Sequence, residues 1–168
     1  MRISCFVISI IIFPSILLAQ PSRHKQTLGW VEKVKLSPED LVLHAKLDPS
    51  SDTSSIHADN IEHFIKDGKK WVRFTVGDRN EKSKIIEKPV VRIAKIKHST
   101  GKTIKRVTVE LGMCLGHTLM QDEVTLADRS HLEYEMLIGR SFLAGNVVID
   151  PALIFTMEPS CSNQQQAE

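Results

Sequence analysis

Short runs in which hydrophobic and polar residues alternate follow one another along most of the chain, separated by residues typical of turns. A repeat of two is the periodicity of a β-strand that buries one face. Strands are therefore expected at residues 27–36, 41–47, 56–58, 60–65, 71–76, 84–97, 104–111, 121–126, 146–150 and 153–157. The only helical signal is a single turn at 141–145.

The turns between these runs support the same fold class. Asp67-Gly68 and residues 98–102 are typical of hairpin turns, and the glycines within 112–117 indicate a bend or bulge. Many short strands joined by such turns, with almost no helix, predict an all-β barrel or sandwich.

The N-terminus carries the features of a cleaved secretory signal at residues 1–19. Arg2 supplies the positive start, residues 3–18 are mostly apolar, and the small Ala19 precedes the expected cut at Gln20. A membrane anchor is the alternative, but the run is short for a span of about 20 apolar residues and Pro14 interrupts it. The protein is therefore expected to be exported, either periplasmic or secreted.

The rest of the chain has the length of one domain. We expect a flexible N-terminus at residues 20–27, the domain at 28–158 and a disordered polar tail at 159–168. Loss of Arg2 with the signal lowers the formal net charge from +2 to +1. This near-neutral balance of mixed charges gives no basis for a nucleic-acid partner.

After signal removal the cysteines are Cys114 and Cys161. In an oxidising compartment they can form a disulfide that attaches the tail to a strand. The alternative is a buried free thiol and a separate tail thiol, and sequence spacing does not decide between them.

Two distant segments carry the candidate chemistry. In the first, the apolar run 41–47 leads directly into Asp48 and a small polar turn. In the second, Leu137 and Ile138 precede Gly139 and Arg140. Retroviral-type aspartic proteases combine such an aspartate, in an Asp-Thr-Gly motif, with an aliphatic-aliphatic-Gly element packed beneath it.

Together with further blocks, these segments resemble a bacterial family of retropepsin-like aspartic peptidases whose members are labelled ATP-dependent zinc proteases. The matching blocks are residues 29–32, 45–48, 53–58, 88–92, 125–131 and 137–145. The resemblance implies a closed retropepsin-like barrel and one catalytic aspartate per chain, Asp48. It also implies a homodimer that pairs two such aspartates, and a peptide or protein substrate.

The chain departs from the family motif directly after Asp48. Pro49 replaces the usual Thr or Ser and has neither a hydroxyl nor an N–H, and Ser50 replaces a glycine. Both changes count against a well-positioned pair of aspartates. A shifted alignment would make Asp52, followed by Thr53, the catalytic residue, but it moves the aspartate away from the end of the strand.

The residues that flank the motif are expected to support it. Asp128 and Arg129 are expected to form an ion pair near residues 137–139. Arg140 is expected to neutralise a buried carboxylate or to bind a substrate carboxylate.

The zinc and ATP of the family label have no motif in this sequence. There is no glycine-rich phosphate loop and no His-Glu-x-x-His, so no cofactor and no ATP are expected. His57, His117 and His131 would form a metal site only if the fold brought them together; surface or hydrogen-bonded histidines are the favoured interpretation.

The sequence thus predicts an exported aspartic endopeptidase with an Asp48 pair across a homodimer. The alternative is a catalytically degenerate pepsin-like scaffold that binds a peptide or a cell-envelope partner. A metal-dependent hydrolase is the weakest hypothesis.

Overall fold

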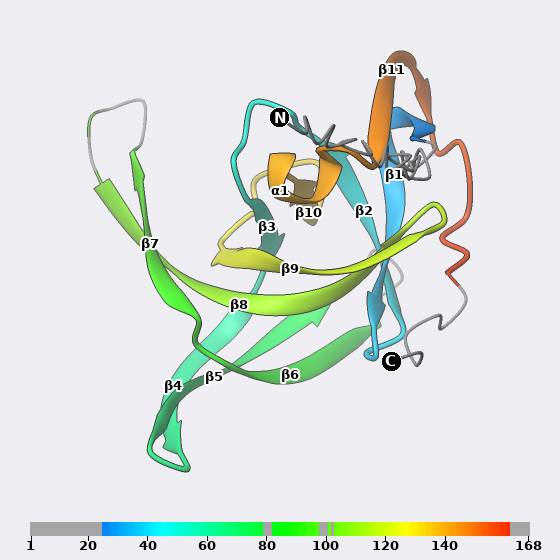
Figure 1. Ribbon diagram of the computed structural model, residues 1–168. Helices are drawn as coiled ribbons and strands as arrows, with labels where there is room; N and C mark the ends of the chain where they lie inside the picture. Colours follow the sequence, from blue (N-terminus) through cyan, green and yellow to red (C-terminus); the bar gives the residue numbers. More distant parts are fainter. Residues whose placement is uncertain (1–24, 79–81, 98–100, 102, 162–168) are drawn as a thin grey trace, which may run out of the picture.

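The computed structural model describes residues 25–78, 82–97, 101 and 103–161, and the expected signal at 1–19 lies outside them (Figure 1). The strands and the helix of this part are β1 (Gln26–Ser37), β2 (Leu41–Leu47), β3 (Ser54–His57), β4 (Asp59–Lys66), β5 (Lys69–Gly77), β6 (Ser83–Pro89), β7 (Arg92–Lys97), β8 (Thr103–Leu115), β9 (Thr118–Ala127), β10 (Met136–Ile138), α1 (Arg140–Leu143) and β11 (Val147–Ile154). The expected all-β class is confirmed. No helix among the described residues is long and apolar enough to span a membrane.

A closed barrel forms the body of the molecule. The larger sheet has eight strands in the order β11-β1-β2-β10-β3-β9-β8-β7, and an additional pairing of β1 with β8 closes it. Six strands therefore form the barrel, while β11 and β7 flank it outside the closure. This closed barrel is the retropepsin-like architecture expected from the sequence.

A second sheet, with strand order β4-β5-β6, lies against the barrel on the side away from α1 (Figure 1). The β5 side chains of Val72, Phe74 and Val76 are fully buried and belong to the same hydrophobic cluster as the barrel residues Leu43 and Leu111. The two sheets therefore share one core, whose burial is the main stabilising contribution.

The single strand expected at 84–97 is wrong, because β6 and β7 belong to different sheets. Pro89 ends β6 and has no backbone N–H for a continuing ladder. The Val90 N–H then donates to the Lys70 carbonyl at 2.9 Å, and the Val91 N–H donates to the Thr108 carbonyl at 2.9 Å. At these two residues the chain crosses from one sheet to the other, which alternation along one segment does not reveal.

Two other local expectations also change. The strands expected at 146–150 and 153–157 are one continuous strand, β11, which pairs in parallel with β1. The bend expected at 112–117 is confined to Gly116 and His117, since β8 continues to Leu115. The expected hairpin at 98–102 is supported by the pairing of β7 with β8, although most of its turn residues lie outside the described part.

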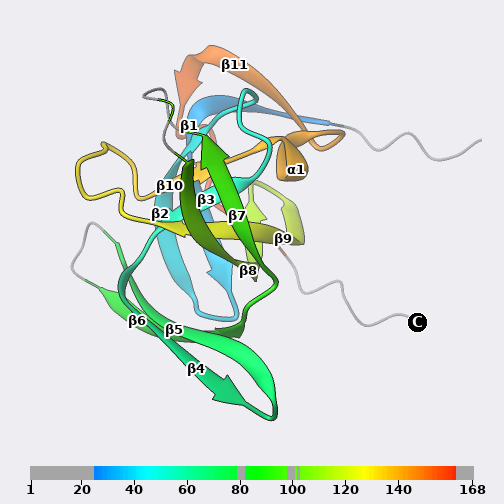
Figure 2. The ribbon, with the colours of Figure 1, turned by 90° about the vertical axis from the view of Figure 1, so that its left-hand side faces the viewer.

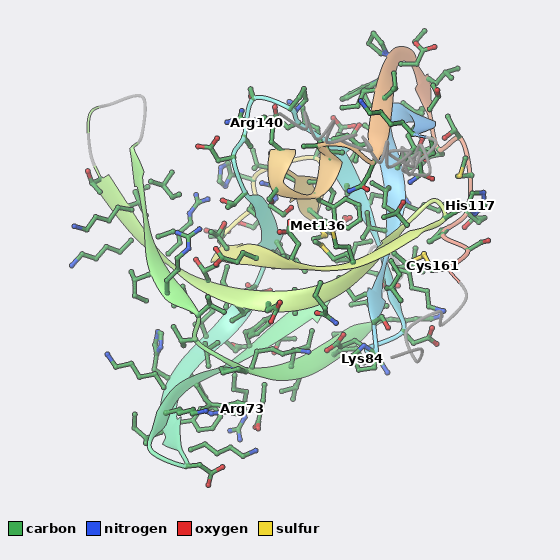
Figure 3. All side chains as sticks on the ribbon, viewed as in Figure 1. Arg73, Lys84, His117, Met136, Arg140 and Cys161 are labelled. Atoms are coloured by element: carbon green, nitrogen blue, oxygen red, sulfur yellow. A yellow bond between two sulfur atoms is a disulfide. The ribbon has the colours of Figure 1, made fainter. Side chains whose placement is uncertain are left out.

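At both ends, the domain extends beyond its predicted bounds. Gln26 and Thr27, expected to be flexible, pair with Val147 and Val148 of β11. At the other end, a disulfide joins Cys161 to Cys114 of β8 (Figure 3). The tail is thereby attached to the barrel as far as Cys161, and residues 162–168 lie outside the described part.

Candidate active site

Asp48 stands at the end of β2, where that strand runs between β1 and β10. Leu41, Leu43, Ala45 and Leu47 point into the core, so the alternation of β2 determines the direction of its last residues. The Asp48 N–H donates to the Ile138 carbonyl at 2.9 Å, which attaches the aspartate backbone to the end of β10. Its side chain is 18% exposed.

The Asp48 carboxylate is held by its own turn. Its Oδ1 accepts the Ser50 N–H at 3.0 Å and the Ser50 hydroxyl at 2.6 Å, while Lys46 Nζ lies 3.9 Å from Oδ2. The Ser50 hydroxyl is the main cause that holds the pKa of Asp48 below its ordinary value of 3.8, and partial burial opposes it. Asp48 is therefore an ionised acceptor at neutral pH.

The substitution of Ser50 for the usual glycine is accommodated in this fold. Ser50 is exposed, and it is absent from the described non-glycine residues that have a positive φ. The position therefore does not require a glycine conformation. Ser50 also adds a hydroxyl donor to the carboxylate, so only Pro49 removes donors from the motif.

We predict that Ser50→Ala raises the pKa of Asp48 toward its ordinary value, because the main stabilising donor of the carboxylate is lost. A carboxyl carbon NMR titration measures this directly. Since the folded pKa lies below the unfolded one, Asp48 contributes stability above about pH 3.8, and this contribution is lost as the pH falls through the folded pKa. Ser50→Ala reduces that contribution.

Ser51→Ala is the matched control, because Ser51 is the smallest of the main causes of the shift. An Asp48 titration that is the same in Ser50→Ala and in the unmodified protein would contradict the assigned role of the hydroxyl.

Arg140 ties the turn after Asp48 to the start of α1 (Figure 3). Its Nη1 donates to the Pro49 carbonyl at 2.8 Å, and its guanidinium also pairs with the Asp52 carboxylate. The Arg140 N–H donates to the Ser51 carbonyl at 2.8 Å. The expectation that Arg140 neutralises a buried carboxylate is wrong, since the Asp52 side chain is 83% exposed.

The Leu137-Ile138-Gly139 element lies directly beneath this turn. Leu137 and Ile138 belong to β10, which pairs in parallel with β2 and in antiparallel with β3, and Gly139 follows as the N-cap of α1. A Cβ on Gly139 would lie 2.5 Å from the Thr53 carbonyl carbon, so only glycine permits this approach. The Gly139 N–H donates to Ser54 Oγ at 3.1 Å. Asp48, Thr53 and Gly139 thus meet at one place because the ends of β2, β3 and β10 converge.

Among the described residues, Asp128 and Arg129 do not form the expected ion pair. The Asp128 carboxylate accepts the Ser130 N–H and hydroxyl at 3.0 and 2.7 Å. Arg129 turns inward and donates to Ser55 Oγ at 3.0 Å and to the Tyr134 carbonyl at 3.2 Å. Arg129 is only 8% exposed, and burial lowers the pKa of its guanidinium.

A concave cleft of about 560 Å³ opens beside the Ser50–Thr53 turn. Its lining includes four cationic residues from β7, from β8 and from the segment after β9: Arg92, Lys95, Arg106 and Arg129. Lys95 pairs with Lys105, so strand alternation directs its side chain to the face opposite Arg92 and Arg106. Arg92 also pairs with Glu123 at 2.7 Å, while Asp52 is the one acidic lining residue among the described part of the chain. The cleft is therefore positively charged overall and suited to an acidic ligand.

Sequence reasoning missed this cleft. The density of Lys and Arg between residues 92 and 106 is the signal that could have found it. Only the pairing of β7 with β8, and of β3 with β9, brings those cations beside the turn that follows Asp48.

The described histidines do not form a metal centre. Among the described residues, no group of three or more His, Cys, Asp or Glu side chains is arranged to hold a metal ion. His57 Nδ1 accepts the Arg129 N–H at 2.9 Å, and its Nε2 lies 3.2 Å from Asp59. His117 lies in the turn between β8 and β9, and its Nδ1 is 3.4 Å from the carbonyl oxygen of Ser160 in the C-terminal segment. These residues do not fit the zinc of the family label.

Comparisons with known proteins are consistent with the closed barrel. A family model described as retropepsin-like aspartic endopeptidase RimB matches residues 27–160. The chain belongs to this RimB-like family. The expected family resemblance is thereby confirmed.

The chain is also similar to part of some longer proteins that carry another name. Two similar proteins are named probable alpha-L-glutamate ligase. The one from Desulfotalea psychrophila is 34% identical over 114 residues, 66% of this chain and 25% of its own length. The one from Shewanella halifaxensis is 34% identical over 126 residues, 73% of this chain and 26% of its own length. The chain thus spans about a quarter of these relatives.

A solved structure of the same fold is also similar. It is the crystal structure of a Legionella pneumophila protein of unknown function, with a TM-score of 0.67 and 36% sequence identity. The match covers 77% of this chain and 96% of that protein.

Proposed function

We propose that this RimB-like protein is an exported aspartic endopeptidase that hydrolyses peptides rich in acidic side chains, with Asp48 from each chain of a homodimer as the catalytic pair. The observation that carries the proposal is the Asp48 carboxylate itself. It stands at the end of a barrel strand, is ionised and partly exposed, and its backbone is bonded to the end of β10.

The chemistry follows from the electrostatics of two close carboxylates. Two carboxyl groups held about 3 Å apart cannot both ionise, so the pair shares one proton. The ionised Asp48 accepts a proton from a water molecule as that water attacks the peptide carbonyl. The protonated Asp48 donates a hydrogen bond to the carbonyl oxygen, and a proton is then passed to the leaving amine.

This mechanism requires two copies of the chain. One chain offers a single aspartate at the end of β2, next to the β10 element, so the pair is complete only across a two-fold axis. A protein that stays monomeric in analytical ultracentrifugation at high concentration would contradict the proposed pair.

The acidic substrate is supported by the charge of the cleft beside the catalytic turn. Arg92, Lys95, Arg106 and Arg129 line it. Arg129 is buried, and its guanidinium donates to neutral oxygens of Ser55 and Tyr134. The relatives named glutamate ligases add an independent reason. A module fused to an enzyme that attaches glutamate is well suited to act on glutamate-bearing peptides.

Export is supported by the apolar N-terminal run that follows Arg2 and by the disulfide between Cys114 and Cys161. Disulfides of this kind persist in oxidising compartments such as the periplasm. We therefore infer a periplasmic or secreted protein whose peptide substrates are met after export.

The test is hydrolysis of glutamate-rich peptides between about pH 4 and pH 7, the range in which a carboxylate pair works. Matched peptides with glutamine in place of glutamate separate the need for negative charge from the need for a peptide bond. We expect cleavage of the first set to exceed that of the second. Equal cleavage of both sets would support the peptidase activity but contradict the preference for acidic peptides.

We predict that Arg106→Gln lowers kcat/KM for glutamate-rich peptides by about ten- to a hundredfold, because a charge-assisted contact to substrate is lost. The rate with glutamine-rich peptides is expected to change little. Lys105→Gln is the matched control, since Lys105 is the exposed neighbour on β8 whose side chain points to the opposite face and does not line the cleft. Equal effects of the two substitutions would contradict the assigned role of Arg106.

The second candidate function is a non-catalytic scaffold that binds a peptide or a cell-envelope partner. Pro49 favours it, because it removes the hydroxyl and the N–H next to the catalytic aspartate. A correctly folded dimer that binds glutamate-rich peptides without cleaving them would support this alternative.

A further inference from the structure

β4 is a free edge of the second sheet. In the strand order β4-β5-β6 it pairs with β5 alone, and Figure 2 shows the β4–β5 hairpin projecting from the barrel with β4 at its outer margin. Apart from Phe64, which is half-buried, all β4 residues are exposed, and they include the apolar side chains of Ile61 and Ile65. An exposed edge strand that carries apolar side chains is a template for pairing with another strand.

The turn of the hairpin determines which backbone groups of β4 are free. Asp67 and Gly68 form the loop between β4 and β5, and both have a positive φ, 51° and 71°, as a type I′ turn requires. In such a hairpin the pair that flanks the loop, Lys66 and Lys69, is hydrogen-bonded, and hydrogen-bonded pairs alternate with non-hydrogen-bonded ones. Every second residue of β4, counted back from Lys66, is therefore bonded to β5.

The free groups consequently belong to His63 and Ile65. Lys66, Phe64 and Glu62 direct their N–H and C=O groups toward β5, so the groups of the residues between them point away from the sheet. An incoming strand that pairs with β4 must therefore bond to His63 and Ile65.

The side chains of Glu62, Phe64 and Lys66 share one face of β4, because side chains alternate along a strand. The contacts of this face agree with the alternation. The Phe64 and Trp71 rings have centroids 6.3 Å apart, and Lys66 Nζ lies 4.7 Å from the centre of the Trp71 ring. Arg73 Nη1 donates to the Glu62 carboxylate at 3.5 Å. Along the edge, this face is thus acidic, then aromatic, then basic.

A second copy of β4 fits this edge in antiparallel orientation. Residues with free backbone groups must lie opposite each other, so a two-fold axis within the regular part of the strand passes His63, Phe64 or Ile65. The irregularity at the start of β4 limits regular pairing to residues 62–66. An axis at Phe64 uses all of this part, because His63 then lies opposite Ile65 of the second copy and the reverse. Such a pairing forms about four backbone hydrogen bonds.

The charges select the same register. With the axis at Phe64, Glu62 lies opposite Lys66 of the second copy on both sides of the axis, and the two Phe64 rings lie opposite each other. Opposite charges and aromatic pairs directly across a strand pair are stabilising. With the axis at His63 or Ile65, Phe64 would instead lie opposite a charged residue. Charged residues on an edge disfavour strands that do not match them, so this edge is specific for its own copy.

We propose that β4 is a docking edge for a second copy of this chain, with β4 paired to β4 about a two-fold axis at Phe64. The second sheets of the two copies then form one continuous sheet. This inference goes beyond the proposed function and does not depend on it. The second sheet lies on the side of the barrel away from α1, whereas the turn after Asp48 is bonded to Arg140 at the start of α1. The two interfaces are therefore separate, and together they link catalytic dimers into larger assemblies.

Sedimentation equilibrium of the full-length protein at increasing concentration tests the pairing. One pair of short strands buries less than the roughly 1,200 Å² of a stable interface, so we expect a Kd on the order of 100 μM. Above that concentration the weight-average mass should approach or exceed about twice that of Lys66→Glu, which places acidic side chains opposite each other. Glu62→Lys should have the same effect. The doubling is expected whether the associating unit is one chain or the Asp48 dimer, so failure of either proposal is distinguishable.

The double substitution Glu62→Lys with Lys66→Glu restores opposite charges across the axis and should restore the association. Lys84→Glu is the matched control, because Lys84 is exposed on β6 at the opposite edge of the same sheet. Circular dichroism verifies the fold of each variant, and peptide cleavage is expected to be unchanged in all of them. Equal masses for the unmodified protein and Lys66→Glu would overturn the proposal. A double variant that associates no better than Lys66→Glu would also overturn it, because β4 would then pair with a different segment.

Discussion

Asp48→Asn is expected to abolish peptide hydrolysis, lowering kcat/KM by at least about 10³-fold. In a homodimer one substitution removes both carboxylates, and an amide neither activates water nor holds the shared proton. The fold should survive, because Asn keeps an oxygen that accepts the Ser50 N–H and hydroxyl. Cleavage of glutamate-rich peptides, with thermal unfolding to verify the fold, measures the effect.

Asp52→Asn is the control for this experiment and also decides between the two alignments of the motif. Asp52 pairs with Arg140 at an exposed position, and exposed pairs contribute about 0–1 kcal/mol. We therefore expect a small loss of activity from a looser turn. Abolition by Asp52→Asn, with activity retained in Asp48→Asn, would establish Asp52 as the catalytic residue instead.

Loss of the Cys114–Cys161 disulfide is expected to lower the free energy of unfolding by about 2–4 kcal/mol, because the bond closes a loop between residues 47 apart in sequence. The double substitution Cys114→Ser and Cys161→Ser removes the bond. The bond also holds the end of the C-terminal segment. This segment contacts β1, because the Thr156 N–H and hydroxyl donate to the Glu32 carboxylate. Urea unfolding followed by circular dichroism measures the difference.

Reduction of the unmodified protein with dithiothreitol is the control, because it should give the stability of the double variant without changing the sequence. The double variant itself should not respond to the reductant. Equal unfolding midpoints for the oxidised protein and the double variant would contradict the stabilising role of the bond.

The local pattern was a good guide where one strand faces one core. In β2 the apolar residues from Leu41 to Leu47 alternate with exposed or half-exposed ones, and the direction of Asp48 follows from that alternation. Alternation failed at 84–97, because Pro89 and the bonds of Val90 and Val91 carry the chain into the other sheet. Alternation of hydrophobic and polar residues shows which face of a strand is buried, but it does not show which other strand pairs with it.

The same distinction separates the motif from its environment. The candidate aspartate and the Leu137-Ile138-Gly139 element were identified from residue type and order. The contact between Arg129 and Ser55 could not be identified in this way. In the sequence Arg129 stands beside Asp128, whereas the buried Ser55 hydroxyl that it contacts is distant in the chain. The proximity of Arg106 to the turn after Asp48 likewise depends on strand pairing.

The all-β class, the family and the place of Asp48 at the end of a strand could be predicted from the sequence, because they depend on residue type and short-range spacing. How Ser50 and Arg140 hold the turn after Asp48, and how the cations of β7 and β8 come to lie beside it, follow only from the tertiary structure. The physical reason is that these features are made by residues distant in the chain, and only barrel closure and the crossing between the two sheets bring them together.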